Sequence, residues 1–137
     1  MTTRRAALAF VAIVAIGAGC GSHADNIETH TIVGTLTYPA SSGLSGTRTC
    51  NGTGGYSDIR SGAQATLTDA DGTIVSAAHI GSGTHGGTPH CTTTFAFPPI
   101  EIESGFYSVE ISHRGKITKS VAELDADGWV FELSLGL

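Results

Sequence analysis

Hydrophobic and polar residues alternate along most of the chain from Thr29 onward, and this period of two is typical of half-buried β-strands. In the first such run, threonines dominate one face and Pro39 ends the strand. The opposite, apolar face consists of Ile32, Gly34, Leu36 and Tyr38. The same alternation predicts six further strands, at residues 63–68, 73–80, 91–97, 107–113, 116–124 and 129–135.

Segments rich in glycine and aspartate separate these strands. Asp69–Gly72 and Asp125–Gly128 both read Asp-Ala-Asp-Gly. We expect turns there, because aspartate accepts hydrogen bonds from turn amides and glycine adopts a positive φ. Neither copy continues with the further ligands of a calcium-binding loop. Residues 40–62 and 81–89 are expected to be loops.

The overall pattern determines the expected fold class. Beyond the N-terminal region, no run of ten or more residues has helical apolar spacing. We therefore predict an all-β fold over residues 29–137, a two-sheet antiparallel sandwich of about seven strands. The large side chains expected on its inward faces are Leu67, Phe95, Phe97, Tyr107, Ile111, Trp129, Phe131 and Leu133.

The first 19 residues form a different kind of segment. Arg4 and Arg5 precede the uncharged run Ala6–Gly19, which ends in small residues. A membrane-spanning helix needs about 20 apolar residues, and this run has 14. We therefore predict a signal peptide at residues 1–19 rather than a permanent transmembrane anchor.

The residues that follow resemble a bacterial lipobox, in which a peptidase cuts before a cysteine that carries diacylglycerol. Here the sequence is Ile16-Gly-Ala-Gly-Cys20. Ala18 and Gly19 match the small residues of that pattern, whereas Gly17 stands where a branched apolar residue is usual. The resemblance implies that Cys20 is the lipid-attachment residue. It also implies that acyl chains hold the protein in the bilayer, at the extracytoplasmic face of the cell membrane.

Lipid attachment also bears on charge and partners. Residues 20–28 are mostly small and polar and would form the lipidated tether. Cleavage removes two of the seven Lys and Arg residues and none of the 12 Asp and Glu residues, so the net charge of −5 becomes −7. Such a domain gains nothing from anionic lipids, and we expect no nucleic-acid partner. The alternative is cleavage after Ala24, which would release a soluble protein.

The cysteine count agrees with export. Three cysteines leave one unpaired. If Cys20 is acylated, Cys50 and Cys91 remain, and an oxidising compartment allows them to form a disulfide. The alternative is a pair of free buried thiols. Packing of Trp129 beside the disulfide would make the sandwich immunoglobulin-like, although the chain order of these three residues differs from that of an immunoglobulin domain.

Two longer stretches carry a family resemblance. One joins residues 50–59, CNGTGGYSDI, to residues 68–75, TDADGTIV, and the other is residues 106–115, FYSVEISHRG. Together they resemble small exported lipoproteins of actinobacteria, of the mycobacterial type. The resemblance implies a cell-envelope location and a transthyretin-like β-sandwich, and it assigns no catalytic residue.

Histidines are the main candidates for a metal site. His79, His85 and His90 are close in the sequence, and a glycine-rich loop could let them converge on Zn²⁺. The Gly-Gly-Thr-Pro sequence between His85 and His90 does not dictate how the two imidazoles lie relative to each other, so a solvated loop is the simpler interpretation. We therefore predict no metal and no other cofactor.

Two residues of the first long loop are candidates for a ligand pocket. Asp58 and Tyr56 lie near the expected disulfide in the sequence, although such an aspartate more often accepts backbone N–H bonds and holds a loop in place. Further along the chain, the segment His113-Arg-Gly-Lys116 is a small basic tip. It could contact an anionic partner, although a solvated turn is the simpler interpretation.

Signatures of catalysis are missing from the sequence. It contains no Gly-x-Ser-x-Gly, no His-Glu-x-x-His and no phosphate-binding glycine loop. We therefore expect a non-enzymatic envelope lipoprotein whose sandwich binds a small ligand or another envelope protein. One alternative is a small metal-dependent hydrolase or metal-binding protein of the envelope that uses His85, His90 and Asp58. The other is a purely structural spacer.

Overall fold

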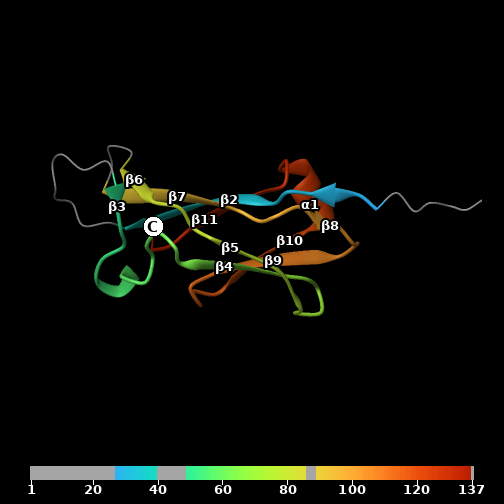
Figure 1. The fold of residues 1–137 in the computed structure, drawn as a ribbon, viewed down its shortest axis with the longest axis horizontal. Helices are drawn as coiled ribbons and strands as arrows, with labels where there is room; N and C mark the ends of the chain where they lie inside the picture. Colours follow the sequence, from blue (N-terminus) through green and yellow to red (C-terminus); the bar gives the residue numbers. More distant parts are fainter. Residues whose placement is uncertain (1–26, 40–48, 86–88, 137) are drawn as a thin grey trace, which may run out of the picture.

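Two β-sheets stack on each other in the computed structural model, which describes residues 27–39, 49–85 and 89–136 (Figure 1). The strand order is β10-β9-β4-β5 in one sheet and β11-β2-β7-β6-β3 in the other. The first sheet comprises β4 (Gln64–Thr68), β5 (Ile74–His79), β9 (Phe106–Ile111) and β10 (Lys116–Ser120). The second comprises β2 (Val33–Pro39), β3 (Thr49–Cys50), β6 (Gly83–His85), β7 (His90–Ala96) and β11 (Val130–Ser134). The expected all-β sandwich is therefore confirmed.

A few short elements complete the fold. They are β1 (Thr29–His30), which pairs with β8 (Ile100–Glu101), the short 3-10 helix η1 (Gly54–Tyr56) and the helix α1 (Val121–Ala126). In the described part of the chain no helix is long and apolar enough to cross a membrane. The expected signal peptide, Cys20 and most of the tether lie outside the described residues.

The core consists of the faces that the alternating pattern predicts. On β2 the expected inward residues are buried, and the same holds for β7, where Cys91, Thr93 and Phe95 point inward. Each large apolar side chain removed from water in this way contributes about 1.5–3 kcal/mol. All but one of the large side chains expected in the core are buried, and the exception is Trp129.

Trp129 is half-buried because of its place between α1 and β11. It has a positive φ of 66°, its backbone N–H donates to the Leu124 carbonyl and its carbonyl accepts from the Val33 N–H. The indole stacks on the His30 ring, with centroids 3.7 Å apart. Trp129 therefore closes the α1 end of the sandwich, which lies opposite the β3 and β6 end (Figure 1). The expected packing of Trp129 beside the disulfide is wrong.

The chain closes the second sheet with a parallel strand. β11 runs parallel to β2, whereas every other strand pair in the described residues is antiparallel. The alternating pattern predicts which residues of β11 face inward but carries no information about strand direction. The parallel pairing arises because α1 and the turn after it return the chain to the end of the sandwich where β2 begins (Figure 1).

The strand expected at residues 116–124 ends early and becomes a helix. β10 stops at Ser120, where a capping box begins α1. The Ser120 hydroxyl accepts from the Glu123 N–H, and the Glu123 carboxylate accepts from the Ser120 N–H. The Ser-x-x-Glu spacing satisfies two amides that a helix start otherwise leaves unpaired, so it outweighs the strand pattern. Of the turn expected at Asp125–Gly128, the first two residues belong to this helix, and Asp127 and Gly128 form the turn that follows it.

Parts of the expected loops also adopt regular structure. β3 and η1 lie in the predicted loop 40–62, and β6 lies in the predicted loop 81–89. Glycine and threonine suggested loops there, but β6 pairs with β7 and β3 pairs with β6. The strand predicted at residues 107–113 stops at Ile111, the last residue of β9, and His113 is exposed in a turn with a φ of 62°.

The two central strands approach each other closely where Gly34 faces Phe95. The two residues are paired in the β2–β7 register, and a Cβ added at Gly34 would lie 2.1 Å from the Phe95 ring. We expect Gly34→Ala to lower the free energy of unfolding by about 1–3 kcal/mol, because the ring must leave its position in the core. Urea denaturation followed by circular dichroism measures this change.

Gly55→Ala is the matched control. No atom lies within 4 Å of a Cβ added at Gly55, so its stability should stay within about 0.5 kcal/mol of the wild type. Equal stability of the two variants would show that Phe95 does not need the space above Gly34.

Candidate functional site

A disulfide joins Cys50 of β3 to Cys91 of β7, as the cysteine count predicts. Their Cα atoms are 6.1 Å apart and the residues are 41 positions apart in the sequence. Both are buried, with Cys91 fully inaccessible and Cys50 8% exposed. Closing a loop of this length restricts the unfolded chain and stabilises the fold by up to about 4 kcal/mol.

The backbone around this disulfide is held independently of the sulfur–sulfur bond. Cys50 pairs with Gly83 of β6, and the Tyr38 hydroxyl donates to the Cys50 carbonyl at 3.3 Å. A Cβ added at Gly83 would lie 2.2 Å from that hydroxyl and 2.4 Å from the carbonyl oxygen. Only glycine at this position therefore lets β3, β6 and the buried Tyr38 side chain come together.

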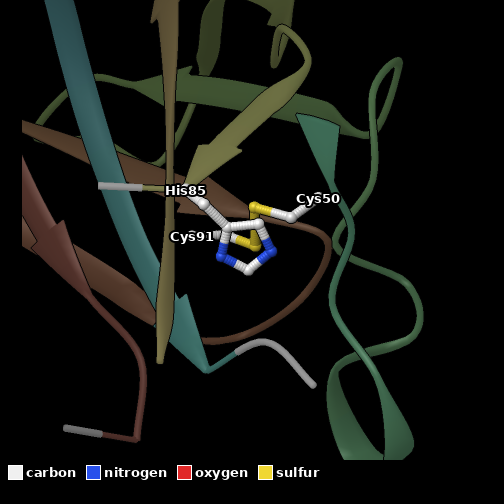
Figure 2. Close-up of side chains that lie close together, drawn as sticks. All are labelled: Cys50, His85 and Cys91. Carbon is white, nitrogen blue, oxygen red and sulfur yellow. A yellow bond between two sulfur atoms is a disulfide. The ribbon is translucent and has the colours of Figure 1, made fainter. Parts of the chain in front are cut away.

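His85 lies directly over the disulfide (Figure 2). It pairs with Cys91 in the antiparallel register of β6 and β7, so the two side chains share one face. A ring nitrogen of His85 and the two sulfur atoms all lie within 4.8 Å of one another. This is the one group of three or more potential metal ligands among the described residues. His85 is exposed, so one side of the group faces solvent.

The other histidines that the sequence suggests do not join this group. The Nδ1 atom of His79 lies 3.0 Å from the Gly62 carbonyl oxygen, with which it shares a hydrogen bond. His90 lies on β7 next to Cys91 and is half-buried, but it is outside the ligand group. Asp58 is outside it as well, so the structure does not bring His85, His90 and Asp58 together as one set of ligands.

Asp58 instead forms an ion pair with Arg114 of the basic tip. The Arg114 Nε donates to Asp58 Oδ2 at 3.0 Å, and the guanidinium also donates to Asp58 Oδ1 and to the Gly55 carbonyl. The guanidinium carbon lies 5.0 Å from the centre of the Tyr56 ring. Arg114 therefore ties η1 and its flanking residues to the β9–β10 turn. Asp58 and Tyr56 both contact the guanidinium of Arg114.

Hydrogen bonds from the positively charged guanidinium of Arg114 hold the pKa of Asp58 below its ordinary value near 3.8. The same pair raises the pKa of Arg114. Both side chains are about one-third exposed, so water screens the attraction and limits its contribution to stability.

One aspartate side chain in each Asp-Ala-Asp-Gly copy has a structural partner. Asp69 Oδ1 accepts from the backbone N–H groups of Asp71 and Thr73, at 3.0 and 2.8 Å, which confirms the predicted turn. Asp127 forms an ion pair with Lys119, whose ammonium also donates to the Val130 carbonyl. Lys119 therefore links β10 to β11 beside α1.

A pocket of about 150 Å³ lies further along the seam between β10 and β11, where the two sheets meet at an open side of the sandwich. Both sheets supply its walls, and the charged residues in them are Arg114 and Lys116. The apolar lining residues are Leu36, Val109, Ile111, Ile117, Leu133 and Leu135. Ile117 is 49% exposed and faces Val109 across β10 and β9, so it lies at the accessible side of the pocket.

Sequence reasoning singled out neither this pocket nor the place of His85 beside the disulfide. Alternation could have indicated that Ile117 faces inward from β10, since it is the apolar residue between two polar ones. No local signal could have indicated the need for glycine at position 83, because the need arises from atoms of β2 and β3.

No family model, no curated protein and no solved structure matches the chain.

The Asp58–Arg114 pair makes the free energy of unfolding at acidic pH depend on the ionisation of Asp58. Because the folded-state pKa of Asp58 is lowered, its contribution to stability is present above the ordinary pKa and is lost as the pH falls through the folded-state pKa. We expect Asp58→Asn to lower the free energy of unfolding by about 0.5–1 kcal/mol near pH 6. The difference from the wild type should shrink below pH 3.8, as measured by urea denaturation across pH.

Asp71→Asn is the control for this prediction. Asp71 is exposed, and its backbone N–H rather than its carboxylate bonds within the turn. Its stability should follow the wild type at every pH. A stability difference for Asp58→Asn that does not change with pH would contradict an ionised pair with Arg114.

Proposed function

We propose that this chain is a non-enzymatic, exported lipoprotein whose sandwich binds a small amphipathic anion in the seam pocket between β10 and β11. The observation that carries the proposal is that pocket: a cavity open at one side, lined by apolar residues of both sheets and by two cationic residues.

The volume limits the size of the apolar group. An engineered protein cavity of about 150 Å³ lined by leucine, isoleucine and phenylalanine holds one benzene molecule. The seam pocket has a similar volume, and six of its ten lining residues are leucine, isoleucine or valine. It therefore suits an apolar group of about six carbons, such as a short alkyl chain or one aromatic ring.

The charges at the pocket favour an anionic head group. Arg114 and Lys116 line it, and no acidic residue does. Asp58 partly neutralises Arg114, and Glu110 faces Lys116 across β9 and β10, so the local positive charge is modest. The chain has more acidic than basic residues, but the lining of this pocket contains two cationic side chains and no carboxylate.

Export and anchoring rest on the N-terminal sequence. The signal-like residues 1–19, the lipobox-like sequence before Cys20 and the resemblance to actinobacterial lipoproteins all support attachment to the extracytoplasmic face of the cell membrane. The Cys50–Cys91 disulfide also supports export, because disulfides persist in oxidising compartments. Lipid anchoring would keep the pocket close to the membrane surface.

The pocket proposal is tested with three six-carbon probes that differ in charge: hexanoate, hexanol and hexylamine. In an NMR titration we expect saturable shifts at Val109, Ile111 and Leu133, with hexanoate binding tightest and hexylamine weakest. Ile117→Trp should weaken hexanoate binding at least about tenfold, because the larger side chain fills the accessible side of the pocket.

Ile74→Trp is the matched control. Ile74 is 63% exposed on β5, at the opposite edge of its sheet, and it does not line the pocket. Its hexanoate affinity should equal that of the wild type. Binding that survives Ile117→Trp unchanged, or that is as tight for hexylamine as for hexanoate, would overturn the proposed ligand class.

Anchoring is tested on the full chain expressed in a bacterium with lipoprotein processing. We expect the membrane fraction to contain protein whose intact mass equals Cys20–Leu137 plus diacylglycerol. Cys20→Ser should remove the lipid mass. A native mass equal to Asp25–Leu137 would exclude the anchor and indicate cleavage after Ala24.

A further inference from the structure

We propose that Cys50, Cys91 and His85 form a Zn²⁺ site when the disulfide is reduced, so that the redox state of one bond decides whether the protein holds a metal. This inference is independent of the seam pocket, because none of the three residues lines that pocket.

The three side chains share one face of the β3–β6–β7 part of the sheet. Cys50 faces Gly83, His85 lies two residues beyond Gly83, and Cys91 faces His85. Because side chains alternate along a strand, these positions all point to the same side. Gly83 contributes no side chain between Cys50 and His85, and the Tyr38 hydroxyl occupies the space that a Cβ at Gly83 would take.

The distances suit a tetrahedral ion. At Zn–S distances of about 2.3 Å and Zn–N distances of about 2.0–2.1 Å, ligand atoms around one Zn²⁺ lie about 3.5–3.8 Å apart. In the oxidised protein the ring nitrogen and the two sulfur atoms already lie within 4.8 Å of one another. Small rotations of the three side chains are therefore enough to surround an ion after reduction.

The strands keep these donors together without the sulfur–sulfur bond. Backbone pairing joins β3 to β6 and β6 to β7, and the Tyr38 hydroxyl holds the Cys50 carbonyl. Reduction removes one covalent link but none of these contacts. The ligand group is therefore largely preformed, which lowers the entropy lost on metal binding.

A dithiol can reduce the Cys50–Cys91 disulfide. The dithiol supplies two electrons and two protons, the Cys50–Cys91 bond breaks to give two thiols, and the reductant becomes a disulfide. Each thiol loses its proton when it binds Zn²⁺, and neutral His85 binds through the lone pair of a ring nitrogen. Two thiolates and one imidazole leave a fourth position, which faces solvent because His85 is exposed.

The experiment uses the full chain without an affinity tag and with Cys20→Ser, so that Cys50 and Cys91 are the remaining thiols. The protein is reduced with a phosphine, desalted without oxygen and titrated with Co²⁺ as a spectroscopic probe and then with Zn²⁺. We expect one Co²⁺ per chain with thiolate-to-cobalt charge-transfer absorption that Zn²⁺ removes. The oxidised protein should show neither.

The His85→Ala variant distinguishes metal binding by all three residues from binding by the two thiols alone. Loss of one of three protein ligands should weaken Zn²⁺ binding at least about tenfold, because even a residue outside the ligand shell changes affinity by about 10–100-fold. His90→Ala is the matched control, since His90 lies next to Cys91 but outside the group. Its affinity should equal that of the parent protein.

Circular dichroism of the reduced protein shows whether the strands survive loss of the disulfide. A retained strand signal, or one that Zn²⁺ restores, supports a site that the fold assembles. The proposal is overturned if the reduced protein binds no metal, if His85→Ala binds as tightly as the parent, or if the oxidised protein binds equally well. A strand signal that is lost on reduction and not restored by Zn²⁺ overturns it as well.

Discussion

The disulfide between Cys50 and Cys91 is the constraint on which this end of the sandwich depends. β7 lies at the centre of its sheet, between β2 and β6, whereas β3 is a two-residue edge strand. Two backbone pairs and the hydrogen bond from Tyr38 to the Cys50 carbonyl hold this strand in place, and the covalent link adds to them by joining it to the central strand β7. Tyr38 and Gly83 then determine how closely the three strands pack.

The opposite end of the molecule is closed without covalent bonds. The capping box at Ser120 begins α1, Trp129 stacks on His30, and Lys119 links β10 to β11. These contacts close the seam between the two sheets beside α1 and leave it open further along, where the pocket lies. The pocket is therefore a consequence of how the C-terminal strand returns to the sheet.

The two proposed sites use different parts of the same architecture. The seam pocket belongs to the edge strands β10 and β11, whereas the cysteine–histidine group belongs to β3, β6 and β7. One depends on apolar volume between the sheets and the other on side chains that share one face of a sheet. Ligand binding and metal binding can therefore be changed separately by substitution.

The sequence by itself determined most of the longer strands and most of the large residues that face the core, because an alternating pattern can bury only one face. It also predicted the cysteine pairing, from the number of cysteines, and the turn at Asp69, from residue type and local spacing. Only the tertiary structure decided the parallel pairing of β11, the bond between Asp58 and Arg114, and the position of His85 over the disulfide. Each of these joins residues from different elements. Their proximity depends on how the strands are ordered in space, and alternation along one strand says nothing about that order.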